Sequence, residues 1–184
     1  MLEIERLELD GVFEIIPKRF GDGRGFFSET YNGPRFAEGG IDIAFVQDNH
    51  SLSTKAGTVR GLHYQLPPFA QDKLVRVVRG AIIDVVVDIR RSSPTFRRWL
   101  SLEVSAEKWN QILVPKGYAH GFVTLADDTE VIYKVSEHYS LAHDRSLRFD
   151  DPDLAIDWPI AASQASLSEK DRTAPYLAMA ELFD

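Results

Sequence analysis

Short runs of strand-forming residues, separated by turn residues, follow one another along most of the chain. Valine, isoleucine, phenylalanine and tyrosine fill these runs, and glycine, proline, aspartate and asparagine lie between them. The predicted strands are VFEIIP (12–17), GFFSETY (25–31), IAFVQDNHS (43–51), TVRGLHYQL (58–66), KLVRVVRGAIIDVVVDIR (73–90), WLSLEVS (99–105), NQILVPKGY (110–118), HGFVTLA (120–126) and EVIYKVSEHYS (130–140).

Helical patterns are short in this sequence. Helical turns are expected only at GPRFAEGG (33–40), at SAEKWN (105–110), near DPDLAIDW (151–158) and at TAPYLAMAEL (173–182). After Ser140 strand formers become fewer, and this segment is expected to be an irregular arm that wraps the rest of the fold. Many short strands at this spacing favour an all-β fold, a jelly-roll barrel with a few short helices, whose interior can hold a small ligand.

Two polar residues share a predicted strand face with valines. Side chains of a strand alternate between its two faces, so Lys73 lies on the face of Val75, and Tyr133 lies on the face of Val131 and Val135. If the valines point inward, the lysine and the tyrosine point inward with them. The alternatives are a surface lysine with a buried stem and an ordinary half-buried tyrosine bonded to a carbonyl group.

The stretch TVRGLHYQ (58–65) places Arg60 and His63 three positions apart in a strand. Strict alternation would point them to opposite faces. Gly61 lies between them, and a glycine inside a strand often marks a β-bulge, which shifts the alternation by one residue. We therefore expect a bulge that brings both side chains into the same cavity; a regular ladder would contradict it.

Composition and charge limit the class of protein. The chain of 184 residues is expected to form a single domain, 1–184, with a net charge of −7 and a pI of about 5.2, so no general basic surface for nucleic acid or acidic lipid is expected. There is no cysteine, no basic and apolar leader at the N-terminus and no apolar run of membrane-spanning length. These features predict a soluble cytoplasmic protein.

The spacing of five residues resembles the cupin superfamily, whose barrels commonly hold a metal ion. His63 and His120 occupy histidine positions of its two motifs, but Gln65 stands where a second histidine would lie. Lys73, seven residues before Gly80, stands where a glutamate would lie. An ammonium group repels a divalent ion and cannot bind it as a ligand. The resemblance therefore predicts a cupin-type barrel with a cavity but with no catalytic metal and no other cofactor.

Seven phrases in order resemble the dTDP-4-dehydrorhamnose 3,5-epimerase family and extend over nearly the whole chain. One such phrase would be weak, but seven at matching intervals are specific. They are GDGRGFFSETY, FVQDNHSLS, GTVRGLHYQ, DKLVRVVRGAIIDVVVDIR, PKGYAHGF, YKVSEHY and LSEKD.

The resemblance implies an isomerase that inverts C3 and C5 of dTDP-4-dehydro-6-deoxy-D-glucose to give dTDP-4-dehydro-L-rhamnose, in dTDP-L-rhamnose synthesis. It implies that His63 is the base, oriented by Asp171, that Tyr133 is the acid, and that Lys73 and His120 contact the sugar near its keto oxygen. The further implied substrate contacts are Arg24 and Arg60 to the diphosphate, Glu29, Gln47, Asp48 and Asn49 to the nucleotide, and Asp144 and Lys170 elsewhere in the site.

Several alternatives stay open at the level of sequence. A single-site epimerase or a 3,4-ketoisomerase on a related sugar would need similar acid and base groups, a binding module would need only the cavity, and a metal-dependent oxygenase would need the ligands that are missing here. The two arginines could pair with surface carboxylates instead of a diphosphate. Asp144 stands where glutamate is frequent in the family, which leaves its contact open. The resemblance also implies a homodimer, with LEIERLELDGVFEIIP (2–17) as the interface segment.

Overall fold

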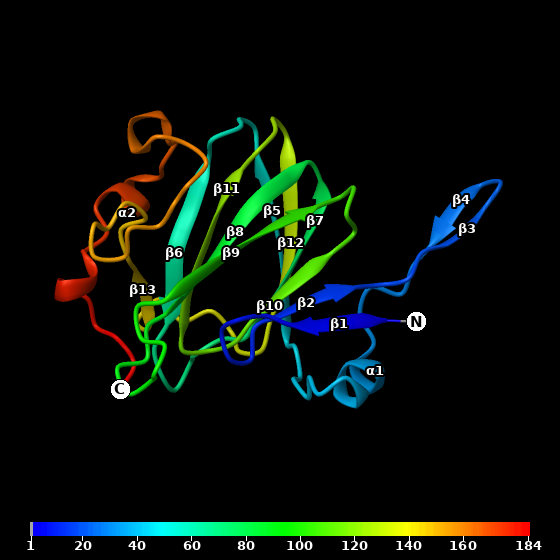
Figure 1. The fold of residues 1–184 in the computed structure, drawn as a ribbon, viewed down its shortest axis with the longest axis horizontal. Coiled ribbons are helices and arrows are strands. Elements are labelled where there is room, and N and C mark those ends of the chain that lie inside the picture. Colours follow the sequence, from blue (N-terminus) through cyan, green and yellow to red (C-terminus); the bar gives the residue numbers. More distant parts are fainter. Residues whose placement is uncertain (1) are drawn as a thin grey trace.

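Two antiparallel sheets face each other in this computed structural model, which describes residues 2–184 (Figure 1). The six-stranded sheet has the order β1-β2-β10-β7-β12-β5, with β1 Glu3–Arg6, β2 Phe13–Ile16, β10 Gln111–Val114, β7 Lys73–Arg79, β12 Thr129–Val135 and β5 Gln47–Ser53. The five-stranded sheet has the order β13-β6-β11-β8-β9, with β13 Asp144–Ser146, β6 Val59–Gln65, β11 Tyr118–Thr124, β8 Ala81–Asp88 and β9 Trp99–Ser105. This arrangement confirms the all-β jelly-roll prediction, with two separate sheets in place of one closed ladder.

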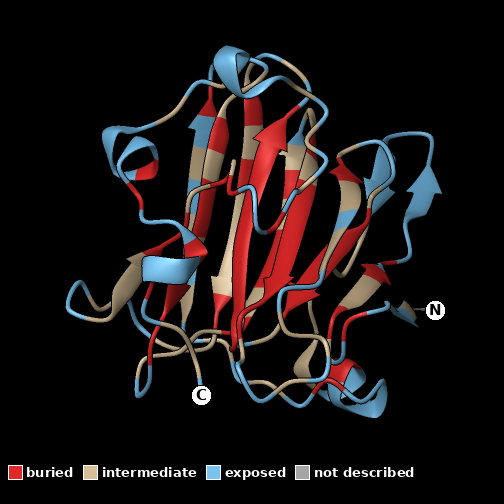
Figure 2. Cartoon of the chain, turned by 60° about the vertical axis from the view of Figure 1, so that its left-hand side comes forward, coloured by how far each residue is buried: buried red, intermediate tan, exposed pale blue. Residues whose placement is uncertain are grey.

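The core between the sheets comes from the predicted alternation. Val75 and Val77 of β7 and Val131 of β12 are almost fully buried and pack against Ile82 and Val86 of β8 in the facing sheet. Strands β8 and β11, in the middle of the five-stranded sheet, are buried along nearly their whole length (Figure 2). Apolar side chains on facing strands are removed from water together, which is the main stabilising contribution to such a fold.

The outer face of the five-stranded sheet is covered by the C-terminal arm, residues 141–184. Leu154 and Leu177 of the arm pack with Leu62, Val85 and Ala119, which point outward from β6, β8 and β11. Strand β8 is apolar on both faces because one face meets the core and the other meets the arm. The predicted irregular arm is therefore confirmed. It adds β13 to the edge of the sheet beside β6 and then continues over the outside of the sheet (Figure 1).

The helices are as short as the pattern predicts. Helix α1 (Gly33–Glu38) forms in GPRFAEGG, and TAPYLAMAEL contains a 3₁₀ turn at Leu177–Met179. The stretches SAEKWN and DPDLAIDW form turns without a helix. Five elements lie outside the predictions. They are strands β1, β3 (Phe20–Asp22) and β13, helix α2 (Glu169–Arg172) and a 3₁₀ turn at Ala162–Gln164.

One hairpin projects away from the rest of the molecule (Figure 1). It consists of β3 (Phe20–Asp22) and β4 (Gly25–Phe27). Phe20, Phe26 and Phe27 on this hairpin are each more than half exposed. Large apolar side chains gathered on an extended element commonly mark an interaction surface.

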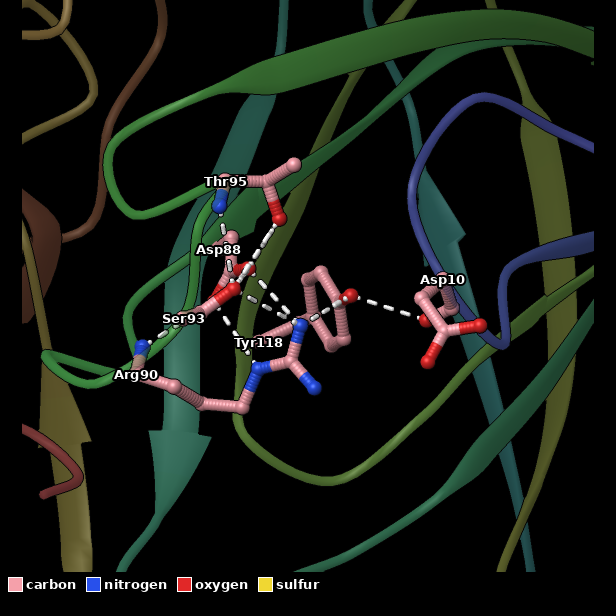
Figure 3. A network of polar contacts seen from close by, with 6 residues as sticks. All are labelled: Asp10, Asp88, Arg90, Ser93, Thr95 and Tyr118. Atoms are coloured by element: carbon pink, nitrogen blue, oxygen red, sulfur yellow. Dashed lines mark hydrogen bonds and ion pairs between the residues drawn. The ribbon is translucent and has the colours of Figure 1, made fainter.

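A buried carboxylate joins the end of β8 to the loop that follows it (Figure 3). The six residues of this network are Asp10, Asp88, Arg90, Ser93, Thr95 and Tyr118. Asp88 is fully buried and accepts hydrogen bonds from Arg90 Nη2 at 2.7 Å, from Ser93 Oγ at 2.6 Å and from Thr95 Oγ1 at 2.6 Å. Burial raises the pKa of Asp88, but these hydrogen bonds outweigh it and lower the pKa to about 2.

Candidate active site

A histidine and an aspartate that are distant in sequence meet at the wall of a polar cavity of about 400 Å³. His63 on β6 forms a hydrogen bond from Nε2 to Oδ1 of Asp171 on α2 at 2.5 Å. The His63 side chain is 31% exposed, toward the cavity, and Asp171 is 4% exposed. Because Nε2 is bonded to the carboxylate, it carries the ring proton, and Nδ1 is the nitrogen that is left to accept one.

The electrostatics of this pair suit a base. Burial lowers the pKa of His63 below 6.5, although the hydrogen bond and the charge of Asp171 oppose this shift. Burial raises the pKa of Asp171, but hydrogen bonds from His63 and Ser168 outweigh it and hold the pKa below its ordinary value. At neutral pH the pair is therefore a neutral imidazole beside a carboxylate.

A β-bulge brings Arg60 into the same cavity as His63, as predicted. His63 pairs with His120 of β11 and Arg60 pairs with Phe122, so two residues of β6, Gly61 and Leu62, oppose one residue of β11. Gly61 has φ +123° in this irregular stretch. Both Arg60 and His63 line the cavity, and Arg60 is held by bonds from Nε to Ser53 Oγ at 3.0 Å and from Nη2 to the Leu52 carbonyl at 2.9 Å.

The facing sheet contributes a lysine and a tyrosine. Lys73 on β7 and Tyr133 on β12 line the cavity together with Val75, which confirms their predicted inward direction. Lys73 Nζ donates to the His63 carbonyl at 3.3 Å, and burial lowers the pKa of Lys73 to about 8. Burial also raises the pKa of Tyr133, so its phenol keeps its proton at neutral pH.

A second histidine–carboxylate pair lies deeper in the cavity wall. His120 on β11 is bonded through Nε2 to Oδ2 of Asp84 on β8 at 2.8 Å, and both residues are buried. Oδ1 of Asp84 has no hydrogen-bond partner within the described part of the chain. Burial raises the pKa of Asp84, although the charge of His120 opposes the shift. His120 was predicted from the sequence, but Asp84 was missed.

Two adjoining cavities share the central residues. The first has a volume of about 400 Å³ and the second of about 250 Å³. His63, Lys73 and Tyr133 line both of them. The residues that line the second cavity alone include Gln47, Asn49, Tyr139, Asp144 and Lys170. The structure thus groups most of the predicted site residues along one continuous space.

Asp144 has two partners in the second cavity. It accepts hydrogen bonds from Lys170 Nζ at 2.5 Å and from the Tyr139 hydroxyl at 3.1 Å. Gln47 is close by, since its Oε1 accepts from the backbone N–H of Tyr139 at 3.3 Å and its Nε2 donates to Asn49 at 2.8 Å. These side chains form a polar wall with both signs of charge.

Three residues that were predicted to contact the substrate do not line either cavity of the single chain. Arg24, at the tip of the projecting hairpin, has a side chain 91% exposed and paired with Asp22 at 2.6 Å. Glu29 forms an ion pair with Arg35 at 2.8 Å. Asp48 points to the other face of β5 from Gln47 and Asn49 because a strand alternates, and it pairs with Lys134. The contacts of these three residues with a nucleotide stay predictions.

The polar groups at the cupin motif positions have other partners. Gln65 donates to the Phe69 carbonyl at 2.7 Å and to the His138 carbonyl at 3.2 Å, and it accepts from the Ser140 N–H at 2.7 Å. Its amide is therefore occupied in holding loops. Among residues 2–184, no group of three or more His, Cys, Asp or Glu side chains is arranged to hold a metal ion. The metal-free site stays a prediction.

Two residues that sequence reasoning missed carried a signal. Asp84 is a charged residue inside the apolar run AIIDVVVD, where a lone carboxylate is costly and needs a partner. Ser168 precedes Asp171 by three positions, which is the spacing of a helix-capping motif. Tyr139 and Gln71, which also line the second cavity, carried no such signal.

The fold and the site define the class of protein: a cupin-type jelly-roll barrel with a histidine–aspartate pair, a lysine and a tyrosine around an internal cavity. A family model for dTDP-4-dehydrorhamnose 3,5-epimerase matches residues 6–179, and this chain belongs to that family.

Individual relatives are similar over nearly the whole chain. The dTDP-4-dehydrorhamnose 3,5-epimerase of Sinorhizobium fredii is 51% identical over 173 residues, which is 94% of this chain and 88% of the relative. The Bacillus anthracis dTDP-4-dehydrorhamnose 3,5-epimerase, solved with TDP and PPi bound, superposes with a TM-score of 0.92 at 46% identity, covering 96% of this chain and 99% of that one.

A third similar protein was solved with a sugar nucleotide. The dTDP-6-deoxy-D-glucose-3,5-epimerase of Legionella pneumophila, in complex with dTDP-4-keto-L-rhamnose, has a TM-score of 0.93 and 42% identity, covering 98% of this chain and 95% of that one. In the described part of this chain, no helix has the length and apolar character that crossing a membrane requires.

Proposed function

We propose that this protein is an isomerase that inverts C3 and C5 of dTDP-4-dehydro-6-deoxy-D-glucose to give dTDP-4-dehydro-L-rhamnose, in dTDP-L-rhamnose synthesis. The observation that carries the proposal is the placement of His63 and Tyr133 on facing sheets around one cavity, with Lys73 lining both cavities beside them. Family membership supports the same substrate class.

The chemistry follows from the ketone of the substrate. A carbonyl group at C4 acidifies the hydrogens on C3 and C5, because the electron pair left by either proton delocalises onto the keto oxygen as an enolate. Inversion removes a proton from one face of the carbon and returns a proton to the other face. Each step therefore needs a base, a group that stabilises the enolate and an acid on the far side.

His63 acts as the base through Nδ1. Asp171 fixes the tautomer with the proton on Nε2, and its carboxylate stabilises the imidazolium that forms when Nδ1 takes the proton from carbon. The lowered pKa of His63 keeps the ring neutral, and so ready to accept a proton, at pH 7. This role requires one step beyond the observed contacts: the sugar must approach Nδ1 of His63.

Lys73 stabilises the enolate and Tyr133 returns the proton. With a pKa of about 8, Lys73 is mostly an ammonium group at neutral pH and places a positive donor at the wall of the cavity. Tyr133 comes from the sheet opposite His63 and keeps its phenolic proton, so it can protonate the carbon on the other face. His120 contributes a further contact near the keto oxygen.

The remaining residues hold the nucleotide part of the substrate. Arg60 presents a guanidinium group, which suits phosphate oxygens, in the first cavity. Gln47, Asn49, Asp144 and Lys170 offer amide, carboxylate and ammonium groups in the second. Residues 1–184 act as one domain in this proposal, in the cytoplasm and without a cofactor or nucleic acid. Met1 lies outside the described residues.

The homodimer belongs to this proposal as well. Arg24 and Glu29 lie in or beside the projecting hairpin and line neither of the two cavities of their own chain. The hairpin also carries three exposed phenylalanines. A second copy that covers these phenylalanines would bring both charged residues to its own cavity. The segment 2–17, predicted as interface, includes β1, which is the edge strand of the six-stranded sheet.

Deuterium incorporation from heavy water tests the activity. Incubation of dTDP-4-dehydro-6-deoxy-D-glucose with the enzyme is expected to place deuterium at both C3 and C5, as read by NMR. Label at one carbon would support the single-site epimerase, a ketone at C3 would support the ketoisomerase, and no exchange would leave only the binding module. His63→Ala is expected to abolish exchange, whereas Tyr133→Phe is expected to permit exchange and impair inversion.

Sedimentation velocity tests the dimer. The wild-type protein is expected to sediment as a dimer, and Phe27→Asp, which places a charge in the apolar hairpin, is expected to shift it to the monomer. Met179→Asp is the control, because Met179 is 81% exposed on the C-terminal arm. A monomeric wild-type protein, or a Phe27→Asp variant that stays dimeric, would contradict this interface.

A further inference from the structure

Both oxygens of the Asp171 carboxylate are engaged. Oδ1 accepts from Nε2 of His63, and Oδ2 accepts from the Ser168 hydroxyl at 2.8 Å. The backbone N–H of Asp171 also donates to Ser168 Oγ at 3.1 Å. The carboxylate is thus held from two sides, by the imidazole on one oxygen and by the serine on the other.

The main chain before Ser168 is fastened to the strand that carries His63. Ser166 accepts from the Val59 N–H at 3.0 Å and donates from its own N–H to the Gly57 carbonyl at 2.9 Å, at the beginning of β6. Ser168 follows two residues later as the N-cap of helix α2. The positions of Ser168 and His63 are therefore both fixed relative to β6, although the two residues are 105 positions apart in sequence.

We propose that Ser168 is a positioning residue for the His63–Asp171 pair: its hydroxyl fixes the orientation of the carboxylate so that Oδ1 faces His63 Nε2. The terminal torsion of an aspartate side chain is broad, so the backbone alone does not set this direction. A donor on Oδ2 restricts the torsion. The consequence for catalysis rests on the proposed function, in which His63 removes the proton.

Ser168 combines two roles that substitutions can separate. As an N-cap it stabilises helix α2, and as a hydroxyl donor it orients Asp171. Glycine is nearly as good an N-cap as serine but has no hydroxyl group, alanine lacks both properties, and threonine keeps both. At the other end of the helix, Thr173 Oγ1 donates to the Glu169 carbonyl at 2.8 Å, and not to the Asp171 carboxylate.

Steady-state kinetics distinguishes orientation from helix stability. Ser168→Ala and Ser168→Gly are both expected to lower kcat about tenfold with KM unchanged, the size expected when a buried carboxylate loses one donor. Ser168→Thr is expected to keep a kcat within about threefold of wild type, and Thr173→Ala to leave kcat unchanged, since it loosens α2 alone. If Ser168→Gly keeps the wild-type kcat, or if KM rises while kcat does not change, the positioning role is wrong.

A double-mutant cycle tests whether Ser168 acts through Asp171. In the Asp171→Asn background, Ser168→Ala is expected to cause no further loss of kcat, because the carboxylate that it orients is already gone. Independent, additive losses would refute the inference.

A spectroscopic readout separates this inference from the proposed function. The His63 Nε2 proton lies in a short, charge-assisted hydrogen bond and is expected as a far-downfield NMR resonance in the free enzyme. The signal is expected to broaden or move upfield in Ser168→Ala and Ser168→Gly and to persist in Ser168→Thr and Thr173→Ala; an unchanged signal in the first two variants would overturn the inference. If this resonance changes in the Ser168 variants but the wild-type enzyme incorporates no deuterium into the substrate, the proposed function is refuted and the positioning role of Ser168 is not.

Discussion

In the proposed mechanism, the charge states of two single residues set the pH range in which the site can work. His63 must be neutral to accept a proton, and burial moves its pKa below 6.5. Lys73 must be charged to stabilise an enolate, and burial moves its pKa down to about 8. The active protonation state, with His63 neutral and Lys73 charged, is therefore present at pH values between the pKa of His63 and the pKa of Lys73.

A bell-shaped pH profile of kcat/KM is the expected outcome, with its acidic limb below pH 6.5 and its alkaline limb near pH 8. Lys73→Met is expected to lower kcat/KM by about 10² to 10³ by removing the cationic donor, and the residual activity is expected to lose the alkaline limb. Rates measured across the pH range for both proteins provide the test. An alkaline limb retained in the methionine variant would assign it to another group.

Asp84 illustrates a residue kept at a cost in stability. It is fully buried, one oxygen has no partner in the described chain, and burial raises its pKa, so the charged form disfavours the folded state at neutral pH. Asp84→Asn removes the charge with almost no change in shape.

This substitution is expected to leave the free energy of unfolding unchanged or raise it by about 1 kcal/mol, while kcat falls about tenfold because His120 loses its anionic partner. Urea unfolding and kinetics on the same preparation measure both quantities. A clear loss of stability together with full activity would show that Asp84 is purely structural.

At the residue scale, the sequence pattern predicted direction better than partnership. Alternation along β7 and β12 correctly placed Lys73 and Tyr133 inside the barrel, because each neighbours valines that must leave water. It could not reveal that Asp84 lies beside His120, since that contact depends on the pairing of β8 with β11. The pairing of His63 with Asp171 came from the family resemblance and not from any spacing.

At the scale of elements, strand β6 depends on one glycine. A Cβ atom on Gly61 would lie 2.6 Å from the Gly121 Cα and 2.8 Å from the His120 carbonyl oxygen, and its φ of +123° disfavours other residues. The two strands approach closely at the bulge that directs Arg60 and His63 into one cavity.

Gly61→Ala is therefore expected to lower the free energy of unfolding by at least about 2 kcal/mol, through both the contact and the backbone strain. Gly23→Ala is the matched control, because no atom lies within 4 Å of its added Cβ and it is expected to change stability by less than about 0.5 kcal/mol. Chemical denaturation of the two variants provides the comparison. Equal stabilities would contradict the close approach.

The elements that sequence reasoning missed are the shortest ones. Helix α2 has four residues, too few for an apolar period, and its position depends on Ser168 and on Arg148, which donates to the Arg172 carbonyl at 3.1 Å. Strand β13 has three residues and exists because it pairs with β6. Strand content, in contrast, was predictable in segments rich in valine and isoleucine, such as 73–90, which forms β7 and β8.

At the scale of the whole molecule, the network around Asp88 connects segments that are far apart. Asp88 ends β8, Arg90 donates to Tyr118 of β11, and the Tyr118 hydroxyl donates to the Asp10 carbonyl in the N-terminal turn. The next residue, Arg91, donates its N–H to the Phe183 carbonyl near the end of the arm. The segment that follows β8 thus connects the N-terminal turn, the barrel and the arm.

Asp88→Asn is expected to lower the free energy of unfolding by about 2–4 kcal/mol, because it leaves Arg90 without its anionic partner. The low pKa of Asp88 stabilises the fold above pH 3.8, and this contribution disappears as the pH falls toward about 2. The variant should therefore lose part of the acid sensitivity of wild type in thermal unfolding. Asp22→Asn in the exposed hairpin is the control, and it is expected to leave the stability unchanged because its ion pair with Arg24 is exposed to solvent.

The arm has one more consequence, for the order in which the enzyme is made. Strands β1 to β12 end at Val135, and His63 is translated long before Asp171 leaves the ribosome. Asp171 and Ser168 of the arm line the first cavity, and Asp144 and Lys170 line the second, so a nascent chain that ends at β12 lacks part of both cavity walls. Because domains generally fold as units, the site is therefore completed only when the arm has been translated.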